Sequence, residues 1–417
     1  MTRSGAKMPF VAIACGGTGG HLFPGLAVAG QLTQRGCAVT LLVSPKEVDQ
    51  QAVKSARDVD IATLPAVALQ NGNYFSFARS FWQSWRAARN IFKLHPPHAV
   101  LAMGGFTSAP PVLAAKKSGA KTFLHESNTI PGRANRFLAR FVDEAFVGFP
   151  ETASRLRVRK VTHTGTPVRS QFQPRDPAAC RAALGLDPHR STILVMGGSQ
   201  GASGLNEMIL SALPLLQQRG QLARESGSPG EHTDQLSALQ FLHLTGANDF
   251  EKIKAAYAAR GIKAIVKPFL AEMDLALGAA SATVSRAGAS SLAEIAAMRL
   301  PSLLVPFPAA ADNHQYHNAR AFEATGAARL LEQKNATPEK VAAMLCELAE
   351  NETLRKSMPA ALVQWHAPKA AEQIAENILN AVFESVDNLS LRSIPDVQSR
   401  TGRSRSNELK QDHVCAA

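Results

Sequence analysis

Glycine-rich turns that follow short apolar runs carry the first chemical information in this 417-residue chain. Residues 16–21 read Gly-Gly-Thr-Gly-Gly-His, directly after the apolar run Phe10–Cys15. Glycines let the backbone approach a ligand closely, and a helix that begins after them points its free N–H groups at an anion. A tight turn that only packs a helix on a sheet is the weaker alternative, because so many glycines stand together. The turn therefore predicts a site for a sugar nucleotide, a phosphate or an acceptor pyrophosphate.

A nicotinamide dinucleotide would need an acidic residue at the end of the next strand, where it holds a ribose. That strand ends in Val43-Ser44-Pro45, which argues against a dinucleotide site. His21 comes directly after the glycines, near the start of a helix. A single histidine is more often structural than catalytic, but its place at the mouth of the turn favours a side chain that faces a ligand. Since an ordinary imidazole has a pKa of about 6.5, His21 could serve as a general base toward a sugar hydroxyl.

A second glycine turn, Gly197–Gly201, follows the apolar run Thr192–Met196. It offers the Ser199 hydroxyl and backbone N–H groups, and Asn206 adds a neutral donor a little further on. Doubly wound sheets bind phosphates at this position, beyond the carboxyl end of a strand. The segment therefore predicts a phosphate site.

Two later segments carry groups that suit a sugar nucleotide. Residues 285–294 read as a strand end, a glycine turn and a helix start, and Glu294 lies where it could accept both hydroxyls of a ribose. A favourable effect of its charge on the helix N-terminus is an equally good explanation. Residues 306–318 are dense in amide and imidazole groups, which suit the hydroxyls of a sugar. Ordinary helix capping by Asp312 is the alternative there.

Neither the carboxylates nor the cysteines indicate a metal. Asp58-Val59-Asp60 has Asp-x-Asp spacing, but no buried strand precedes it, so a solvated loop is the stronger interpretation. The five cysteines are odd in number, far apart and without paired metal spacing, which favours a reduced compartment. We predict no catalytic metal and no cofactor.

Residues 74–93 are aromatic and basic, contain no acidic residue and hold two of the three tryptophans. An amphipathic, cationic segment of this kind suits the headgroup region of an anionic membrane. A helix that buries its aromatic face in the core is a comparable interpretation. In either case the arginines would face solvent.

The net charge of +12 is concentrated in one part of the chain. Residues 1–170 contain 21 Lys and Arg against 8 Asp and Glu, so the whole positive excess lies there. This asymmetry predicts a polyanionic partner, which could be nucleic acid, an anionic lipid surface or a phosphorylated substrate. No recognition helix or RNA-binding motif accompanies the charge, so we expect no nucleic acid. No apolar run reaches the roughly 18 residues that span a bilayer.

Short β-rich runs alternate with helix-like stretches and must position these groups. The predicted strands form two sets of five, namely Phe10–Cys15, Ala38–Val43, Ala99–Met103, Lys121–His125 and Glu144–Gly148, then Thr192–Met196, Phe241–Thr245, Ala264–Phe269, Ala282–Ser285 and Ser302–Pro306. Apolar strands separated by helices predict an α/β fold with parallel sheets covered on both faces. The strand and glycine turn at 13–20 is repeated at 194–201, which predicts two doubly wound domains that face each other across a cleft.

The motifs taken in order resemble those of the undecaprenyldiphospho-muramoylpentapeptide β-N-acetylglucosaminyltransferases of peptidoglycan synthesis. The resemblance extends from about Phe10 to Phe383. It is carried by Gly-Gly-Thr-Gly-Gly-His at 16–21, His-Glu-x-Asn at 125–128, Pro-Val-Arg at 167–169, Gly-Gly-Ser-Gln-Gly-Ala at 197–202 and Asp-x-x-Gln at 312–315. Each motif is weak alone, and together they are specific.

The resemblance implies two Rossmann-like domains of the GT-B type and transfer of N-acetylglucosamine from UDP-N-acetylglucosamine to the C4 hydroxyl of lipid I. The product is lipid II, formed with inversion and without a metal. Implied donor contacts are Thr18, Gly19, Gly20, Asn128, Arg169, Ser199 and Gln315, with Leu270 at the uracil. The diphosphate and ribose would lie among Ala289, Ser290, Ser291, Leu292, Ala293 and Glu294, with Glu294 on the ribose hydroxyls. His21 corresponds to a suggested base.

We place the domain boundary between Pro167 and Leu186, where prolines interrupt the pattern. Residues 1–170 would form the domain that faces the acceptor and the membrane, and residues 171–384 the domain that binds the UDP-sugar. Leu222–Gln235 is predicted to be a surface loop, and residues 385–417 a disordered tail. Neither segment falls within the resemblance.

Two departures and two rival functions remain at this stage. Ser127 stands where the family often has glutamine and Thr166 where it often has asparagine, which predicts altered substrate contacts and not lost activity. A nonhydrolysing UDP-sugar epimerase, or another GT-B glycosyltransferase, would share the architecture. The family assignment implies a peripheral protein at the cytoplasmic face of the bacterial inner membrane, with an anionic lipid surface and proteins of cell-wall synthesis and division as partners.

Overall fold

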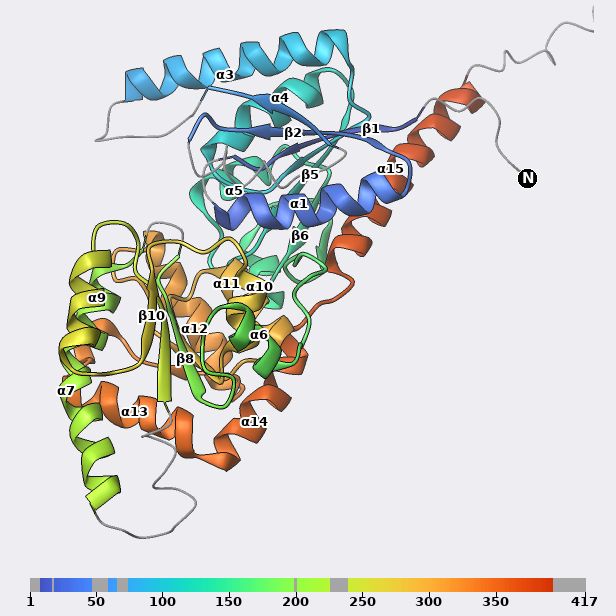
Figure 1. The fold of residues 1–417 in the computed structure, drawn as a ribbon. Helices are drawn as coiled ribbons and strands as arrows, with labels where there is room; N and C mark the ends of the chain where they lie inside the picture. Colours follow the sequence, from blue (N-terminus) through green and yellow to red (C-terminus); the bar gives the residue numbers. More distant parts are fainter. Residues whose placement is uncertain are drawn as a thin grey trace, which may run out of the picture.

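The computed structural model describes residues 8–16, 19–46, 59–65, 74–198, 201–225 and 239–392. They form two β-sheets, each with helices on both faces (Figure 1). Every strand pairs in parallel with its neighbours, and a parallel pair needs a crossover that covers the sheet. The predicted α/β class is therefore confirmed.

The first sheet has the strand order β3-β2-β1-β4-β5-β6-β7. Its strands are β1 (Phe10–Ala14), β2 (Ala38–Val43), β3 (Asp60–Thr63), β4 (Ala99–Ala102), β5 (Lys121–Glu126), β6 (Glu144–Val147) and β7 (Val161–His163). Ile13 of β1 pairs with Leu41 and Leu101. Successive side chains alternate between the faces, so that Ile13 packs under one layer of helices and Ala12 under the other.

The helices of this half lie in two layers. One face carries α1 (Gly19–Gln34) and α15 (Ala370–Arg392). The other carries α3 (Tyr74–Leu94), α4 (Ala109–Lys117) and α5 (Arg133–Leu138). In Figure 1, α1 runs along the side of this half that faces the second sheet.

The second sheet repeats the order as β10-β9-β8-β11-β12-β13. Its strands are β8 (Ser191–Met196), β9 (Leu239–Leu244), β10 (Ala264–Lys267), β11 (Ala282–Ser285), β12 (Ser302–Leu304) and β13 (Arg329–Leu330). Helices α6 (Pro177–Ala183), α10 (Met273–Ala279), α11 (Ala289–Met298), α12 (His314–Ala324) and α14 (Glu352–Leu362) surround one core, and α7 (Ser203–Glu225), α9 (Phe250–Ala259) and α13 (Pro338–Glu350) cover the other face. Both sheets therefore have the doubly wound order that binds nucleotides.

The last helix returns to the first sheet. α15 packs beside α1, where Ile374, Ala375 and Ile378 join the core formed by β1, β2 and β4 (Figure 1). The division at residues 170 and 171 stays a prediction, and α15 reaches across it. Because α15 continues to Arg392, the predicted disordered tail begins inside a helix, and residues 393–417 lie outside the described part. The predicted loop at Leu222–Gln235 likewise begins inside α7, which ends at Glu225.

The chain passes between the halves at two adjacent points, one before α6 and one before α15. They touch where Gly165 packs against Ala367, since a Cβ on Gly165 would lie 2.3 Å from the Cβ of Ala367. Three aromatic rings pack beside this junction. Phe322 stacks on Trp365 at 4.5 Å between centroids, and Phe149 lies 5.4 Å from the Trp365 ring.

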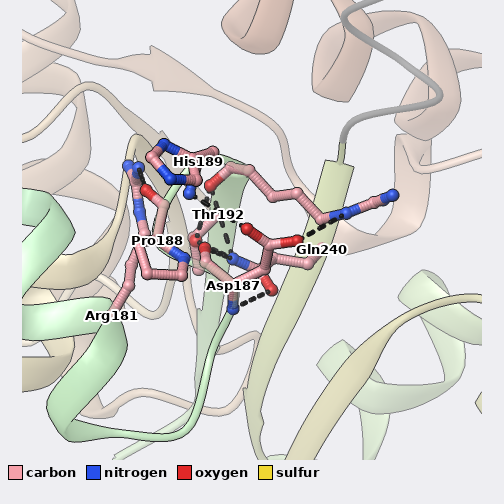
Figure 2. A network of polar contacts seen from close by, with 7 residues as sticks. Arg181, Asp187, Pro188, His189, Thr192 and Gln240 are labelled. Atoms are coloured by element: carbon pink, nitrogen blue, oxygen red, sulfur yellow. Dashed lines mark hydrogen bonds and ion pairs between the residues drawn. The ribbon is translucent and has the colours of Figure 1, made fainter.

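A polar network fastens the amino ends of β8 and β9 (Figure 2). The Gln240 amide donates to the carbonyl of Asp187 (2.7 Å) and to the Thr192 hydroxyl (3.1 Å), and its oxygen accepts from Asp187 N (3.1 Å). Arg181 donates to the carbonyl of Pro188 (3.0 Å). This network lies at the opposite end of the strands from the site described next.

Candidate active site

The carboxyl ends of both sheets open onto a cleft of about 1480 Å³ that both halves line. Ligands of doubly wound sheets bind beyond these ends, where the strand order reverses, here between β1 and β4 and between β8 and β11. The predicted site residues that line the cleft are Gly19, Gly20, His21, Asn128, Arg169, Leu270, Ala289, Ser290, Ser291, Glu294 and Gln315. Thr18 and Ser199 lie outside the described residues. Leu292 is 1% exposed and packs into the core, and Ala293 is not among the residues that line the cleft.

The first glycine turn brings His21 to the floor of the cleft. Gly16 packs so closely under β2 that a Cβ would lie 2.4 Å from Ser44 N. The His21 ring lies over Gly104, where a Cβ would lie 2.7 Å from Nε2. The Thr107 hydroxyl donates to the carbonyl of Gly16 (2.9 Å) and so links the first glycine turn to the turn at Gly104 and Gly105. Both turns need glycine because other backbones or rings occupy the space of a side chain.

Helix α1 begins at Gly19, inside the glycine turn, and therefore contains Pro24. Proline has no N–H, so the carbonyl four residues before it loses its helical donor. That carbonyl belongs to Gly20, and the Ser290 hydroxyl donates to it from the other half (2.8 Å). The proline in α1 thus leaves an acceptor that a residue of α11 satisfies across the cleft.

The N-terminus of α11 projects into the cleft. No side chain caps it, so the N–H groups after Gly288 are available to an anion. Glu294 lies one turn further and is 14% exposed. Burial raises its pKa to about 7, although Arg169, whose Nη2 is 3.6 Å from Oε1, lowers it. The Arg169 guanidinium is held between two rings, 4.2 Å from the centroid of Phe23 and 4.8 Å from that of Phe172.

The second glycine turn continues this wall. Gly197 and Gly198 line the cleft, as does the buried side chain of Leu270. Asn206, predicted as a donor to the ligand, instead faces the interior. Its amide donates to the carbonyl of Thr245 (2.9 Å) and to Asp249 (2.7 Å), and it is 1% exposed.

The segment before α12 is strained and anchored. Asp312 and Asn313 both have left-handed backbones, with φ of 50° and 53°, which non-glycine residues adopt at a cost. The Gln315 oxygen accepts from Ala287 N (3.2 Å) and Phe307 N (2.9 Å), so its –NH₂ is the part left to face a sugar. The Asp312 carboxylate pairs with Arg136 from the first half.

Two buried residues of the selected segments 285–294 and 306–318 complete the site through structural contacts that were not predicted. The buried Arg286 donates to the carbonyls of Val305 and Pro306, both at 3.1 Å, and holds the loop that precedes Asp312. Burial lowers its pKa to about 10, which leaves it cationic at neutral pH. Asn318, 0% exposed, joins the two halves through Asn128 and Thr129. A buried arginine and asparagine give no pattern in the sequence, because their partners are mostly backbone atoms distant in the chain.

The two positions that depart from the family pattern lie side by side. A Cβ on Gly148 would lie 2.5 Å from the Thr166 hydroxyl and 2.9 Å from the carbonyl of Ser127. The Ser127 hydroxyl lies 3.2 Å from His125 Nδ1. Only Ser127 of the pair lines the cleft.

Within the described residues no group of three or more potential metal ligands occurs. Asp58 lies outside those residues, and Asp60 begins the exposed edge strand β3, not the loop that was predicted. No helix in the described ranges is long and apolar enough to cross a membrane.

Helix α3 packs on the first sheet with one side and exposes aromatic side chains on the other. Ser84, Ala88 and Phe92 are buried against the sheet. Phe75 and Trp82 are 82% and 54% exposed. The guanidinium of Arg86 lies 5.3 Å from the Trp82 ring, and that of Arg89 lies 5.3 Å from the ring of Trp85. The helix therefore presents aromatic and cationic groups to solvent on the side away from the core.

Comparison with known families gives matches in both halves. Residues 11–147 match the model of the glycosyltransferase family 28 N-terminal domain, and residues 192–378 match that of the glycosyltransferase family 28 C-terminal domain. Two similar proteins carry the name UDP-N-acetylglucosamine–N-acetylmuramyl-(pentapeptide) pyrophosphoryl-undecaprenol N-acetylglucosamine transferase. The one from Anaeromyxobacter sp. (strain K) is 35% identical over 89% of this chain and 92% of its own length. The one from Xanthomonas euvesicatoria pv. vesicatoria is 36% identical over 98% and 88%.

Solved structures agree in architecture. Acinetobacter baumannii MurG superposes with a TM-score of 0.66 at 27% identity, over 90% of this chain and 100% of that one. Medicago truncatula UGT71G1, solved with UDP-glucose, gives 0.62 at 13% identity, over 89% and 98%. The latter likeness concerns the fold alone.

Proposed function

Because the chain belongs to the family of UDP-N-acetylglucosamine–N-acetylmuramyl-(pentapeptide) pyrophosphoryl-undecaprenol N-acetylglucosamine transferases, within glycosyltransferase family 28, we propose that it catalyses this transfer. The donor is UDP-N-acetylglucosamine. The acceptor is lipid I, whose C4 sugar hydroxyl attacks the anomeric carbon of the donor with inversion. The product is lipid II.

One observation carries the proposal beyond the family assignment. The carboxyl ends of two doubly wound sheets meet at one cleft, and each sheet contributes a glycine turn followed by a helix. Such a cleft can hold a nucleotide on one wall and a phosphorylated acceptor on the other. It supports a reaction between two phosphorylated substrates, as in this transfer.

In the proposed donor complex, the diphosphate lies at the N-terminus of α11, near Ser290 and Ser291. Glu294 accepts the ribose hydroxyls, and Leu270 contacts the uracil. The Gln315 –NH₂ donates to the sugar. Thr18, Gly19, Gly20, Asn128, Arg169, Ser199 and Ala289 complete the donor contacts that we propose from the family's motifs. Leu292 and Ala293, which the resemblance also implied, are left out of this set because Leu292 packs into the core and Ala293 does not line the cleft.

His21 is the proposed general base, which takes the proton of the attacking hydroxyl. Negative charge then grows on the departing UDP. The uncapped N–H groups of α11 and the Arg169 guanidinium lie on the wall where that charge would develop. Preorganised donors of this kind stabilise a leaving group without reorganisation during the reaction. We propose that no metal takes part.

We further propose that the protein binds peripherally to the cytoplasmic face of the inner membrane, through α3 and the basic residues of the first half. The exposed aromatic side chains and arginines of α3 support this location. The lipid acceptor would then reach the cleft from the same surface. Proteins of cell-wall synthesis and division are the proposed partners there. The division of the chain into residues 1–170 and 171–384 remains part of the proposal.

The decisive experiment incubates the protein with labelled UDP-N-acetylglucosamine and EDTA, with and without a lipid I analogue. The expected result is release of UDP only when the acceptor is present, with the label transferred to the lipid. Conversion of the donor without acceptor would instead establish an epimerase. Transfer that EDTA abolishes would contradict the metal-free mechanism while leaving the transferase activity in place.

A further inference from the structure

Glu126, the last residue of β5, is 2% exposed and accepts four hydrogen bonds from the segment that follows it. Oε1 accepts from Asn128 N (2.9 Å) and Asn128 Nδ2 (3.0 Å). Oε2 accepts from Gly132 N (2.9 Å) and Asn135 Nδ2 (2.9 Å). A carboxylate with two bonds on each oxygen has its acceptor positions filled. It therefore organises the segment 128–135 and has no free position for a proton from a substrate.

The segment that Glu126 holds is bonded to the other half of the molecule. The Asn128 side-chain oxygen accepts from Asn318 Nδ2 (3.0 Å), and the Asn318 oxygen accepts from Thr129 N and Oγ1, both at 3.0 Å. Asn318 is fully buried, so these bonds are shielded from water. An unmade bond here would leave a buried polar group unsatisfied.

Asn318 extends the connection to the donor wall. Its Nδ2 also donates to the carbonyl of Ala287 (3.2 Å), and Ala287 N donates to the Gln315 oxygen (3.2 Å). A chain of contacts thus runs from Glu126 through Asn128, Asn318 and Ala287 to Gln315. It begins on the first sheet and ends at a residue that faces the proposed sugar site.

We propose that Glu126 is a positioning residue, whose carboxylate holds residues 128–135 in the geometry that Asn318 recognises and so aligns the two walls of the cleft. The kinetic part of this inference rests on the proposed transferase function. The alignment itself does not, since it concerns contacts within the protein.

The test compares Glu126→Gln with a matched control on the neighbouring strand. Glu144 of β6 is also buried, at 4% exposed, and its carboxylate accepts from Lys160 Nζ (3.0 Å) and the Thr162 hydroxyl (2.6 Å). Glu144 does not line the cleft. Both substitutions exchange a carboxylate for an amide of the same size. At Glu126 the new –NH₂ faces two N–H donors of the segment 128–135.

For Glu126→Gln we expect kcat/KM for the donor to fall by up to about 100-fold, as for a misplaced substrate, with most of the loss in kcat. Glu144→Gln should change it by less than about twofold. The shape of the pH–rate profile should be the same in Glu126→Gln as in the native protein. If the fall in rate at low pH disappeared in Glu126→Gln, Glu126 would be a proton acceptor, and the positioning role would be overturned.

A double-mutant cycle that combines Glu126→Gln with Asn318→Ala tests whether Glu126 acts through the contacts of Asn318. If Glu126 acts through Asn128 and Asn318, the double variant should lose no more activity than the worse single variant. Losses that multiply would overturn the proposal. Should Glu126→Gln fail to fold, Asn135→Ser removes one of the four donors and should give a smaller loss in the same direction.

Amide hydrogen exchange gives a readout that needs no activity. Exchange of residues 128–135 and 312–318 should accelerate in Glu126→Gln and stay at the native rate in Glu144→Gln. Native rates in both variants would overturn the proposal even if transfer is observed. If the native protein transfers no sugar but exchange responds as expected, the proposed function fails and the alignment stands.

Discussion

The protonation state of Glu294, which lines the cleft, changes near neutral pH. Glu294 and Arg169 lie 3.6 Å apart, and burial leaves the carboxyl with a pKa of about 7. The protonated and ionised forms of Glu294 are thus both populated near neutral pH. In the proposed donor complex, only the ionised form would accept from both ribose hydroxyls while it also faces Arg169.

Donor affinity should therefore rise as the pH increases through about 7. Between pH 6 and pH 8 the ionised fraction of such a group grows about tenfold, and the dissociation constant of UDP, measured by calorimetry, should fall by a similar factor. Glu294→Gln should bind weakly and show little pH dependence over this range. Native affinity that does not vary with pH would argue against the ribose contact.

The same shift predicts the sign of a stability effect. The folded pKa of Glu294, about 7, is above the ordinary value of 4.5 for a glutamate, so its contribution to stability is fully present below about 4.5 and is lost as the pH rises through about 7. Glu294→Gln removes this dependence.

His21→Ala should lower kcat by roughly 10²- to 10⁴-fold, the usual contribution of a general base. Donor affinity should change little, because in the proposed mechanism the histidine acts on the acceptor hydroxyl. Stopped-flow transfer and equilibrium UDP binding separate the two quantities. A variant with native kcat would remove His21 from the base role.

How well a strand could be predicted from the sequence depends on whether an apolar run marks it. All ten predicted strands are present, with ends within two residues, because each contains a short apolar run. Nine of them lie in the interior of a sheet, and the tenth, β10, is an edge strand that keeps the apolar run Ala264–Val266. The strands β3, β7 and β13 were missed. They lie at sheet edges or are only two or three residues long, and their side chains are exposed or half-buried, so no apolar run marks them. The glycine turns predicted the position of the cleft. The contacts of three buried residues were not predictable, because they are made largely with backbone atoms and the spacing of residue types in the sequence does not indicate them; these residues are Glu126, Arg286 and Asn318.

The network in Figure 2 joins the amino ends of β8 and β9 and lies outside the candidate active site. Gln240→Leu should reduce the free energy of unfolding by about 1–3 kcal/mol, because Asp187 and Thr192 lose their buried partner. Donor affinity should stay native, since the network lies at the amino ends of β8 and β9. Thermal melting checks the first expectation, with Gln218→Leu on the exposed side of α7 as control. A loss of donor binding in a folded variant would contradict this separation.

From the exposed arginines and aromatic side chains of α3 we expect membrane binding that weakens as the salt concentration rises. Arg86→Gln should weaken binding to phosphatidylserine-containing vesicles roughly fivefold, as expected for about 1 kcal/mol per arginine near an anionic surface. Arg320→Gln, an exposed arginine of α12 in the second half, should bind like the native protein. Vesicle sedimentation at two salt concentrations measures both. Equal losses in the two variants would exclude α3 as the contact.

At the scale of the whole molecule, the halves are folded from interleaved parts of the chain. Ile378, near the C-terminal end of the described chain, is fully buried in the core of the first sheet. Stability of that sheet therefore depends on residues that follow the entire second sheet in sequence.

Ile378→Ala should cost about 2–5 kcal/mol, the usual range for a large-to-small change in a core. The loss should accelerate hydrogen exchange in α1 before it affects α7. Ile209→Ala, in the core beside α7, should give the reverse order. The same order of exchange in both variants would mean that the two halves unfold as one unit.

The two chain crossings that meet at Gly165 and Ala367 have a mechanical consequence. Both covalent connections between the halves run through this one place, so the halves can tilt about it when the non-covalent bonds between them break, but they cannot separate there. The displacement of any group then grows with its distance from that point, as on a lever. Asn318 lies one helical turn before Phe322, which stacks on Trp365 beside the junction, so its bonds would be displaced less by a tilt than bonds further out. An opening motion about the junction would thus widen the far end of the cleft more than the end beside the junction.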